Sequence, residues 1–282
     1  MDGEIIKYIR KSKGLTQQQV LHNAELTQSA FSKFEKNRME LRASALLEIL
    51  GNLDISPKEY SFIRNGYRET KKEQIMNEFF QAPYHKQGEL QRIAAMCEDY
   101  LAYEKSQIIM DILYLCKGLP AILEKNDFSE AFLQTMHIWK RLEKNDELYW
   151  YDLLLINAIF FIFPFEVRET IYAFFKRTLQ KYKHYRDVEI LKINALLNMS
   201  ILYIEERHLV KALKEIEEAI ELCKKEQKYV QLSIAYSRKG ICLKLLKEDG
   251  EFWIQKAKQI LIAVEDLQTL EKLEAEVGYF EE

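Results

Sequence analysis

The feature that most restricts the fold of this chain is its shortage of helix-breaking residues. The 282 residues include only nine glycines and four prolines, the two residue types that most often interrupt helices. Apolar residues recur instead at helical spacing, as at Ile216, Ala219 and Ile220. No segment of useful length alternates β-branched and polar residues. The sequence therefore predicts an all-α protein.

Residues 15–37 contain two short predicted helices, near 16–23 and 27–36, joined by a tight turn. Thr16 and Thr27 each precede a run of helix formers and are expected to cap these helices. The apolar side chains that would pack the two helices together are Leu15, Val20, Leu26, Phe31 and Phe34. Further helices are predicted near 3–12, 42–53 and 56–65, the last opening on Ser56-Pro57. We therefore predict a small helical domain, the head, over residues 1–65.

The second helix of this pair carries polar side chains at its front. Gln28, Ser29, Ser32 and Lys33 offer amide, hydroxyl and ammonium groups, which can meet base edges and phosphates in a DNA major groove. Residues 1–70 hold eleven Lys or Arg against nine Asp or Glu, whereas the rest of the chain holds 30 against 35. The head is thus slightly basic, which agrees with DNA binding but is weak support for it.

The strings LTQQQV and TQSAFSKFEKN resemble the helix-turn-helix family of the phage Cro and repressor proteins. The resemblance covers roughly residues 3–65 and departs at the turn, where Ala24 and Glu25 stand in place of the usual glycine. It implies that the head binds double-stranded DNA and that two heads act together in a homodimer. The implied phosphate contacts are Gln17, Arg10, Arg38 and Arg42, and the implied groove contacts are Gln28, Ser29, Ser32 and Lys33.

A faint repeat of 40 or 41 residues predicts stacked helical hairpins over residues 66–282, forming a regulatory and dimerisation domain. Its clearest unit, residues 196–222, resembles one tetratricopeptide repeat, because small residues at Ser200, Ala212 and Ala219 let two helices approach closely. A further hairpin is expected near residues 72–100, and the last one, near 230–262, is expected to have a shorter turn. Equivalent positions fall at Lys117, Asn157, Asn198 and Arg238 in first helices and at Ala131, Ile171 and Ala212 in second helices.

A helix-turn-helix head followed by helical hairpins resembles the Rgg-type transcription regulators of low-GC Gram-positive bacteria. This resemblance implies a cytoplasmic homodimer whose DNA activity is tuned by a short linear peptide. Asparagine can both donate to and accept from a peptide backbone, and arginine or lysine can pair with a carboxylate. The candidate peptide-binding residues are Asn157, Asn194, Asn198, Arg238 and Lys117. Two other functions stay open: a protein-binding scaffold tethered to DNA, and a repressor that needs no ligand.

Enzymatic and membrane functions find little support in the sequence. It contains no G-x-G-x-x-G, G-x-x-x-x-G-K-[ST] or H-E-x-x-H motif, so we expect no catalytic, cofactor or metal site. The apolar segment 149–165 includes Asp152, Asn157 and Pro164, which favours a buried helix over a membrane span. The polar residues 1–14 lack the apolar stretch of a signal peptide. The four cysteines, expected to be free thiols, are Cys97, Cys116, Cys223 and Cys242.

Overall fold

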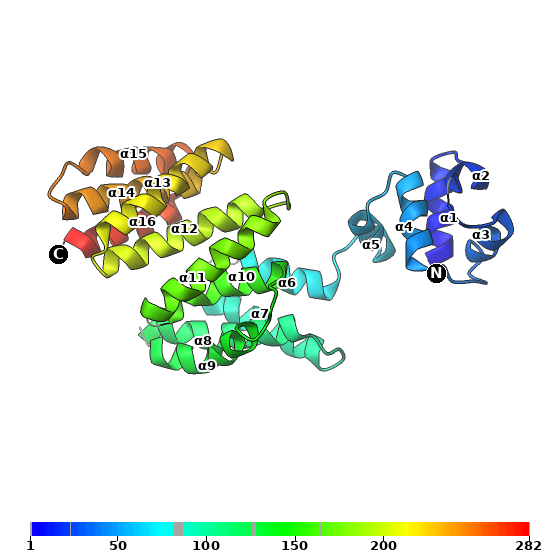
Figure 1. Cartoon of the computed structure of the whole chain (residues 1–282), viewed down its shortest axis with the longest axis horizontal. Helices are drawn as coiled ribbons and strands as arrows, with labels where there is room; N and C mark the ends of the chain where they lie inside the picture. The colour runs from blue at the N-terminus through cyan, green and yellow to red at the C-terminus, as the bar shows by residue number, and fades with distance from the viewer. Residues whose placement is uncertain (1, 23, 82–86, 126–127, 164, 282) are drawn as a thin grey trace. The chain divides into compact units, whose positions relative to one another are not determined.

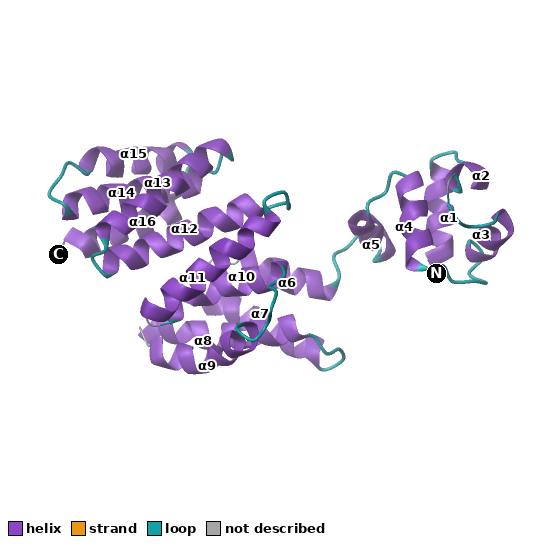
Figure 2. Cartoon of the chain, viewed as in Figure 1, coloured by secondary structure: helices purple, strands orange, loops and turns teal. Residues whose placement is uncertain are grey.

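A computed structural model describes residues 2–22, 24–81, 87–125, 128–163 and 165–281 of the chain (Figure 1). The described residues form α-helices and two short 3-10 helices, and no strand occurs among them (Figure 2). The predicted all-α fold is therefore confirmed. Two compact units can be distinguished, one made of Met1–Pro83 with Arg92–Ile109 and the other of Tyr84–Gln91 with Met110–Glu282.

The head contains five helices around one core. They are α1 (Asp2–Ser12), α2 (Gln17–Val20), α3 (Gln28–Phe34), α4 (Ala43–Asn52) and α5 (Pro57–Arg64). Each agrees with a predicted helix, although α2 ends at Val20 rather than near residue 23. The same unit also contains α6 (Lys71–Gln81) and most of α7 (Gln87–Leu101). These two helices fall where a further hairpin was predicted, and residues 82–86 between them lie outside the described part.

Side-chain caps set the beginnings of three head helices, as predicted. The Thr16 hydroxyl accepts a hydrogen bond from the backbone of Gln19, whose side chain accepts one from the Thr16 backbone in return. The Thr27 hydroxyl caps α3 in the same way without the reciprocal bond. Ser56 caps α5, and Pro57 occupies its first turn, where no backbone donor is needed.

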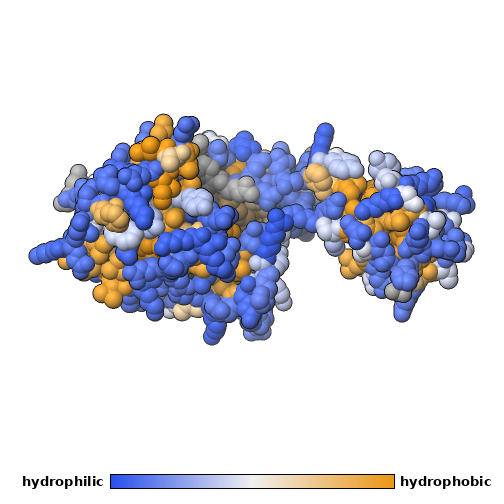
Figure 3. All heavy atoms as spheres, turned by 90° about the horizontal axis from the view of Figure 1, so that it is seen from above, coloured by the Kyte–Doolittle hydropathy of each residue, from blue (hydrophilic) through white to orange (hydrophobic). Residues whose placement is uncertain are grey.

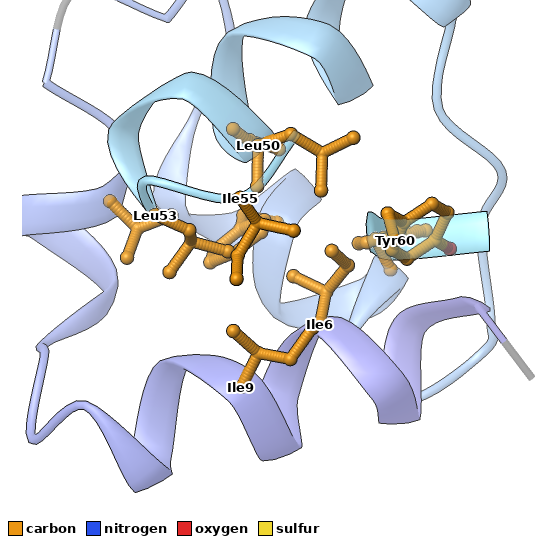
Figure 4. Close-up of a cluster of buried hydrophobic side chains, with 10 residues drawn as sticks. Ile6, Ile9, Leu50, Leu53, Ile55 and Tyr60 are labelled. Carbon is orange, nitrogen blue, oxygen red and sulfur yellow. The ribbon is translucent and has the colours of Figure 1, made fainter. Parts of the chain in front are cut away.

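The core of the head lies where the apolar faces of α1, α3, α4 and α5 meet (Figure 4). Its buried side chains are Ile6, Ile9, Val20, Phe31, Phe34, Ile49, Leu50, Leu53, Ile55 and Tyr60. Of the five apolar residues predicted to join the two motif helices, three are in this core, and Leu15 and Leu26 pack against it partly buried. Burial of each large side chain stabilises the head by roughly 1.5–3 kcal/mol.

The start of α1 and the end of α3 are unusually close because residue 3 is a glycine. A Cβ at Gly3 would lie 1.8 Å from the carbonyl oxygen of Phe34. The Gly3 N–H donates to Oδ1 of Asn37 at 3.1 Å, which satisfies one of the free donors at the helix start. Asn37 itself ends the turn after α3 in the left-handed region, with φ 54°.

We expect Gly3→Ala to destabilise the head by about 2–3 kcal/mol, because the added methyl group can be accommodated only if α1 and α3 separate. Gly51→Ala in α4 is the matched control: a Cβ there meets nothing within 4 Å, and the change should stabilise the helix by up to about 1 kcal/mol. Hydrogen exchange of the α3 amides measures both effects. Wild-type protection of α3 in Gly3→Ala would contradict the close packing.

The second unit is a stack of helical hairpins, which we call the array. Its elements are α8 (Gln107–Lys125), α9 (Phe128–Leu142), α10 (Trp150–Ile159), η1 (Phe160–Ile162), α11 (Phe165–Leu179), η2 (Gln180–Tyr182), α12 (Val188–Glu205), α13 (Leu209–Lys225), α14 (Tyr229–Leu245), α15 (Glu251–Ala263) and α16 (Leu267–Glu281). Helix α10 contacts α12, α12 contacts α14, and α14 contacts α16. The first helices of successive hairpins therefore lie side by side in one layer, as the repeat predicted.

The small residues predicted to let paired helices approach are buried. Ser200, Ala212 and Ala219 are fully shielded from solvent. The expectation of a shorter turn in the last hairpin is wrong, because residues 246–250 join α14 to α15 whereas residues 206–208 join α12 to α13. A Cβ at Gly240 would lie 2.6 Å from the carbonyl oxygen of Gly250. This pair of glycines lets the longer turn fold back against α14.

Buried polar groups fix the second helices against one another. Glu215 of α13 is 7% exposed, accepts a hydrogen bond from the Tyr172 hydroxyl of α11, and lies 3.2 Å from Nζ of Lys176. Burial and the neighbouring Glu215 carboxylate raise the pKa of Tyr172. Within the first hairpin, fully buried Asp111 of α8 pairs with Arg141 of α9, which joins a first helix to its own second helix. Such pairs tolerate the loss of one partner poorly, because the other charge stays buried.

The apolar segment 149–165 forms α10 and η1 inside the array, in agreement with the buried-helix interpretation. Leu153, Leu155 and Ile156 of α10 are buried. None of the helices in the described ranges has the length and apolar character needed to cross a membrane. The four cysteines are free and buried, as predicted.

Candidate functional site

Helix α3 keeps its polar face free. Gln28, Ser29 and Lys33 are exposed and Ser32 is half-buried, whereas Phe31 and Phe34 on the opposite face are in the core. The four polar side chains make no hydrogen bond to the described part of the chain. They are therefore available to an external partner, and their contacts in a DNA groove stay predictions.

Arg10 does not lie where a phosphate contact requires. It is 8% exposed, and its Nε and Nη2 atoms donate to the two Glu35 carboxylate oxygens at 2.6 and 3.0 Å. Its Nη1 donates to the backbone oxygen of Leu15 at 2.7 Å. This placement contradicts the predicted phosphate contact, because the guanidinium faces the core. We assign Arg10 a structural role instead, joining α1 to the end of α3.

Glu35 connects three helices through one carboxylate. Besides the two bonds from Arg10, it accepts a hydrogen bond of 2.7 Å from the amide of Gln17 at the start of α2. Burial raises the pKa of Glu35, but the hydrogen bonds from Arg10 and Gln17 outweigh it and leave the pKa below its usual value. Gln17 keeps one amide hydrogen for the predicted phosphate contact. Arg38 and Arg42 are exposed, so their phosphate contacts also stay predictions.

Asn52, which is not among the residues predicted from the sequence, fixes the turn of the motif. Its side-chain amide on α4 donates to the backbone oxygens of Val20 and His22, both at 2.8 Å. Ala24 and Glu25 replace the usual glycine without strain, since neither adopts a positive φ. Asn23 lies outside the described residues. An asparagine at the end of the otherwise apolar string LLEILGN was the available signal.

The three candidate asparagines lie on neighbouring first helices of the array. Asn157 belongs to α10, and Asn194 and Asn198, one turn apart, belong to α12. All three are half-buried. Oδ1 of Asn157 is secluded from solvent and accepts no hydrogen bond from the described residues, which leaves an acceptor that costs about 1–3 kcal/mol while unsatisfied. Asn194 and Asn198 make no side-chain hydrogen bond within the described ranges. We call these three residues the asparagine row.

The two candidate cations differ in their surroundings. Arg238 of α14 donates from Nε and Nη2 to the carboxylate of Glu276 on α16, at 2.8 and 2.9 Å. Its Nη1 donates to the backbone oxygen of Leu197 on α12 at 2.5 Å. A carboxylate of the chain itself thus holds the position predicted for a peptide carboxylate. Lys117 is exposed on α8, and its role stays a prediction.

The sequence matches no protein-family model and no curated protein. Solved structures do share the fold. A protein of Listeria monocytogenes EGD-e described as a transcriptional regulator matches with a TM-score of 0.78 and 19% identity, over 99% of this chain and 96% of that chain. The SHP pheromone receptor Rgg2 of Streptococcus dysgalactiae matches with a TM-score of 0.70 and 16% identity, over 99% of both chains.

A third structure with this fold is PlcR of Bacillus thuringiensis in complex with the peptide PapR7 and DNA. It matches with a TM-score of 0.70 and 20% identity, over 96% of this chain and 98% of that chain. The chain therefore shares its fold, over nearly its full length, with these three proteins. The fold that the Rgg-type resemblance implied is confirmed.

Proposed function

We propose that this protein is a cytoplasmic DNA-binding transcription regulator, active as a homodimer, whose array senses a short linear peptide. The exposed polar face of α3 on a well-packed head is the observation that carries DNA binding. The asparagine row, three half-buried side-chain amides on neighbouring first helices, carries peptide sensing. The proposal is supported by neighbours of the same fold that include a pheromone receptor and a regulator bound to its peptide and DNA.

In the DNA-binding step, α3 enters the major groove and its side chains meet the base edges. Gln28 has the amide geometry to pair with adenine, and Lys33 reaches guanine or a phosphate. Gln17, Arg38 and Arg42 position the head on the backbone. One head offers a small surface, so two heads of a dimer share one site.

In the sensing step, an extended peptide brings backbone donors and acceptors that water otherwise satisfies. The half-buried side-chain amides of Asn157, Asn194 and Asn198 can each donate to and accept from the peptide backbone. Because these contacts go to the backbone, they tolerate many peptide sequences. Peptide binding favours one arrangement of the array over another and so changes the spacing of the two heads.

Exposed apolar side chains on the last helices of the array support the proposed homodimer. Phe252 of α15 is 61% exposed, and Leu267 and Tyr279 of α16 are 62% and 70% exposed. Figure 3 shows that apolar patches interrupt the largely hydrophilic surface of this unit. A second copy of the chain would cover such residues, in keeping with a homodimer.

We expect the purified protein to bind a mixed-sequence DNA duplex with an affinity that falls steeply as salt rises. Lys33→Ala should weaken this binding and, if Lys33 contacts a phosphate, lower the slope of log affinity against log salt by about 1. Fluorescence anisotropy at several salt concentrations measures the slope. Lys58→Ala removes the same charge from α5 and should leave the slope unchanged. No salt-sensitive affinity for any duplex would refute the DNA-binding function.

A further inference from the structure

Helix α16 contacts α14 and α15 through a small apolar face and several carboxylates. Among its side chains only Leu273 and Val277 are buried. Three of its glutamates make ion pairs with α14 and α15: Glu276 with Arg238 at 2.8 Å, Glu274 with Lys258 at 2.8 Å, and Glu281 with Lys244 at 2.7 Å. The docking of α16 on the array therefore depends in part on these three ion pairs.

The Arg238–Glu276 pair is the most secluded of the three. The two side chains are 12% and 26% exposed, whereas the glutamates of the other pairs are 50% exposed. Bidentate geometry strengthens the secluded pair further, while exposed pairs contribute little. The bond from Arg238 to the backbone oxygen of Leu197 places this guanidinium beside Asn198, the next residue along α12.

We propose that Glu276 competes internally with a carboxylate of the bound peptide for Arg238, and that its displacement frees α16. The proposal deepens the peptide-sensing function and rests on it. In the exchange, one carboxylate leaves the guanidinium and another replaces it, so no buried charge is left uncompensated. Once Glu276 has left, α16 keeps two exposed ion pairs and little apolar burial.

The test uses the full chain, the variant Glu276→Gln and the control Glu274→Gln, which removes the same charge from the same helix. The ligands are three pools of short synthetic random peptides. The first pool lacks Asp and Glu but has a free C-terminal carboxylate. The second pool lacks Asp and Glu and is amidated at the C-terminus, and the third is amidated but contains Asp and Glu. Retention of each pool and hydrogen exchange of α16 are measured. The first and third pools separate a C-terminal from a side-chain carboxylate.

We expect the wild type to retain the second pool, which carries no carboxylate, less well than at least one of the other two. When the wild type binds peptides of the preferred pool, its α16 amides should exchange faster. Glu276→Gln should speed α16 exchange without peptide and raise retention of the preferred pool at least about threefold, because the competitor is gone. Glu274→Gln should resemble the wild type. A Glu276→Gln variant with unchanged retention and unchanged α16 exchange would overturn the proposal.

The failure of this proposal can be told apart from the failure of the proposed function. Equal retention of all three pools that is lost in Asn198→Ala would leave peptide sensing in place and overturn the competition at Arg238. If no variant retains any pool, both the competition and the peptide-sensing function fall.

Discussion

Replacing Arg10 by methionine will unfold the head while the array stays folded. The change leaves the Glu35 carboxylate, whose side chain is 3% exposed, without its cationic partner. An uncompensated buried charge of this kind costs about 3–5 kcal/mol, a large share of the stability of a small domain. Hydrogen exchange of α1 and α3 amides should approach the rate of an unfolded chain. All three tryptophans, Trp139, Trp150 and Trp253, lie in the array. The unfolding transition followed by tryptophan fluorescence should therefore be the same in the variant as in the wild type.

Two further variants isolate the cause. Arg10→Met combined with Glu35→Met replaces both charges by apolar side chains and should recover much of the lost protection. Arg38→Met removes an exposed arginine of the same head and should change stability by no more than about 0.5 kcal/mol. If Arg10→Met alone protects α3 as well as the wild type does, the ion pair does not hold the head together.

The same ion pair makes the head sensitive to acid. Because the folded pKa of Glu35 is lowered, its contribution is fully present above the unfolded pKa of a glutamate and is lost as the pH falls through the folded value. The wild-type head should therefore lose protection on acidification below the ordinary glutamate pKa. The double variant at positions 10 and 35 should lack this part of the pH dependence.

Replacing Asn157 and Asn198 together by alanine should abolish the response to peptide and leave DNA binding without peptide unchanged. Each asparagine contributes about 1–1.5 kcal/mol through hydrogen bonds to the peptide backbone, so the affinity for peptide should fall on the order of 100-fold. A peptide recovered from the retained pool, titrated against the protein and its duplex by anisotropy, measures both quantities.

Asn145→Ala is the control for this pair, because Asn145 lies in the turn before α10 and outside the asparagine row. It should bind peptide as the wild type does. An unchanged peptide response in the double variant would show that the asparagine row is not the binding site, and would favour a scaffold or a ligand-independent repressor instead.

The parts of the fold that depend on local chemistry were predictable from the sequence. Thr16 and Thr27 act within their own helices, and the repeat spacing follows from close packing of hairpins at Ser200 and Ala212. Long-range partners were not predictable. An exposed arginine and a buried one look alike in sequence, so the resemblance implies a phosphate contact for Arg10, whose carboxylate partner lies 25 residues away.

The candidate peptide site shows the same limit. The equivalent positions of Asn157, Asn198 and Arg238 followed from the repeat, and the structure places them on neighbouring first helices. That Arg238 is already paired with a glutamate 38 residues further on could not be read from spacing, because α16 lies beyond the recognisable repeats. Gly3 and Asn52 were missed for a related reason, since each acts on backbone far away in the chain.

Under the proposed function, the separation of roles within α3 has a consequence for how the DNA specificity of such a protein can evolve. Phe31, Phe34 and the carboxylate that follows them anchor the helix, while Gln28, Ser29 and Lys33 contribute nothing to that anchoring. Mutations at the outward positions can therefore change the operator without weakening the domain. A duplicated gene could acquire new targets in few substitutions, because retargeting and folding draw on separate residues of one short helix.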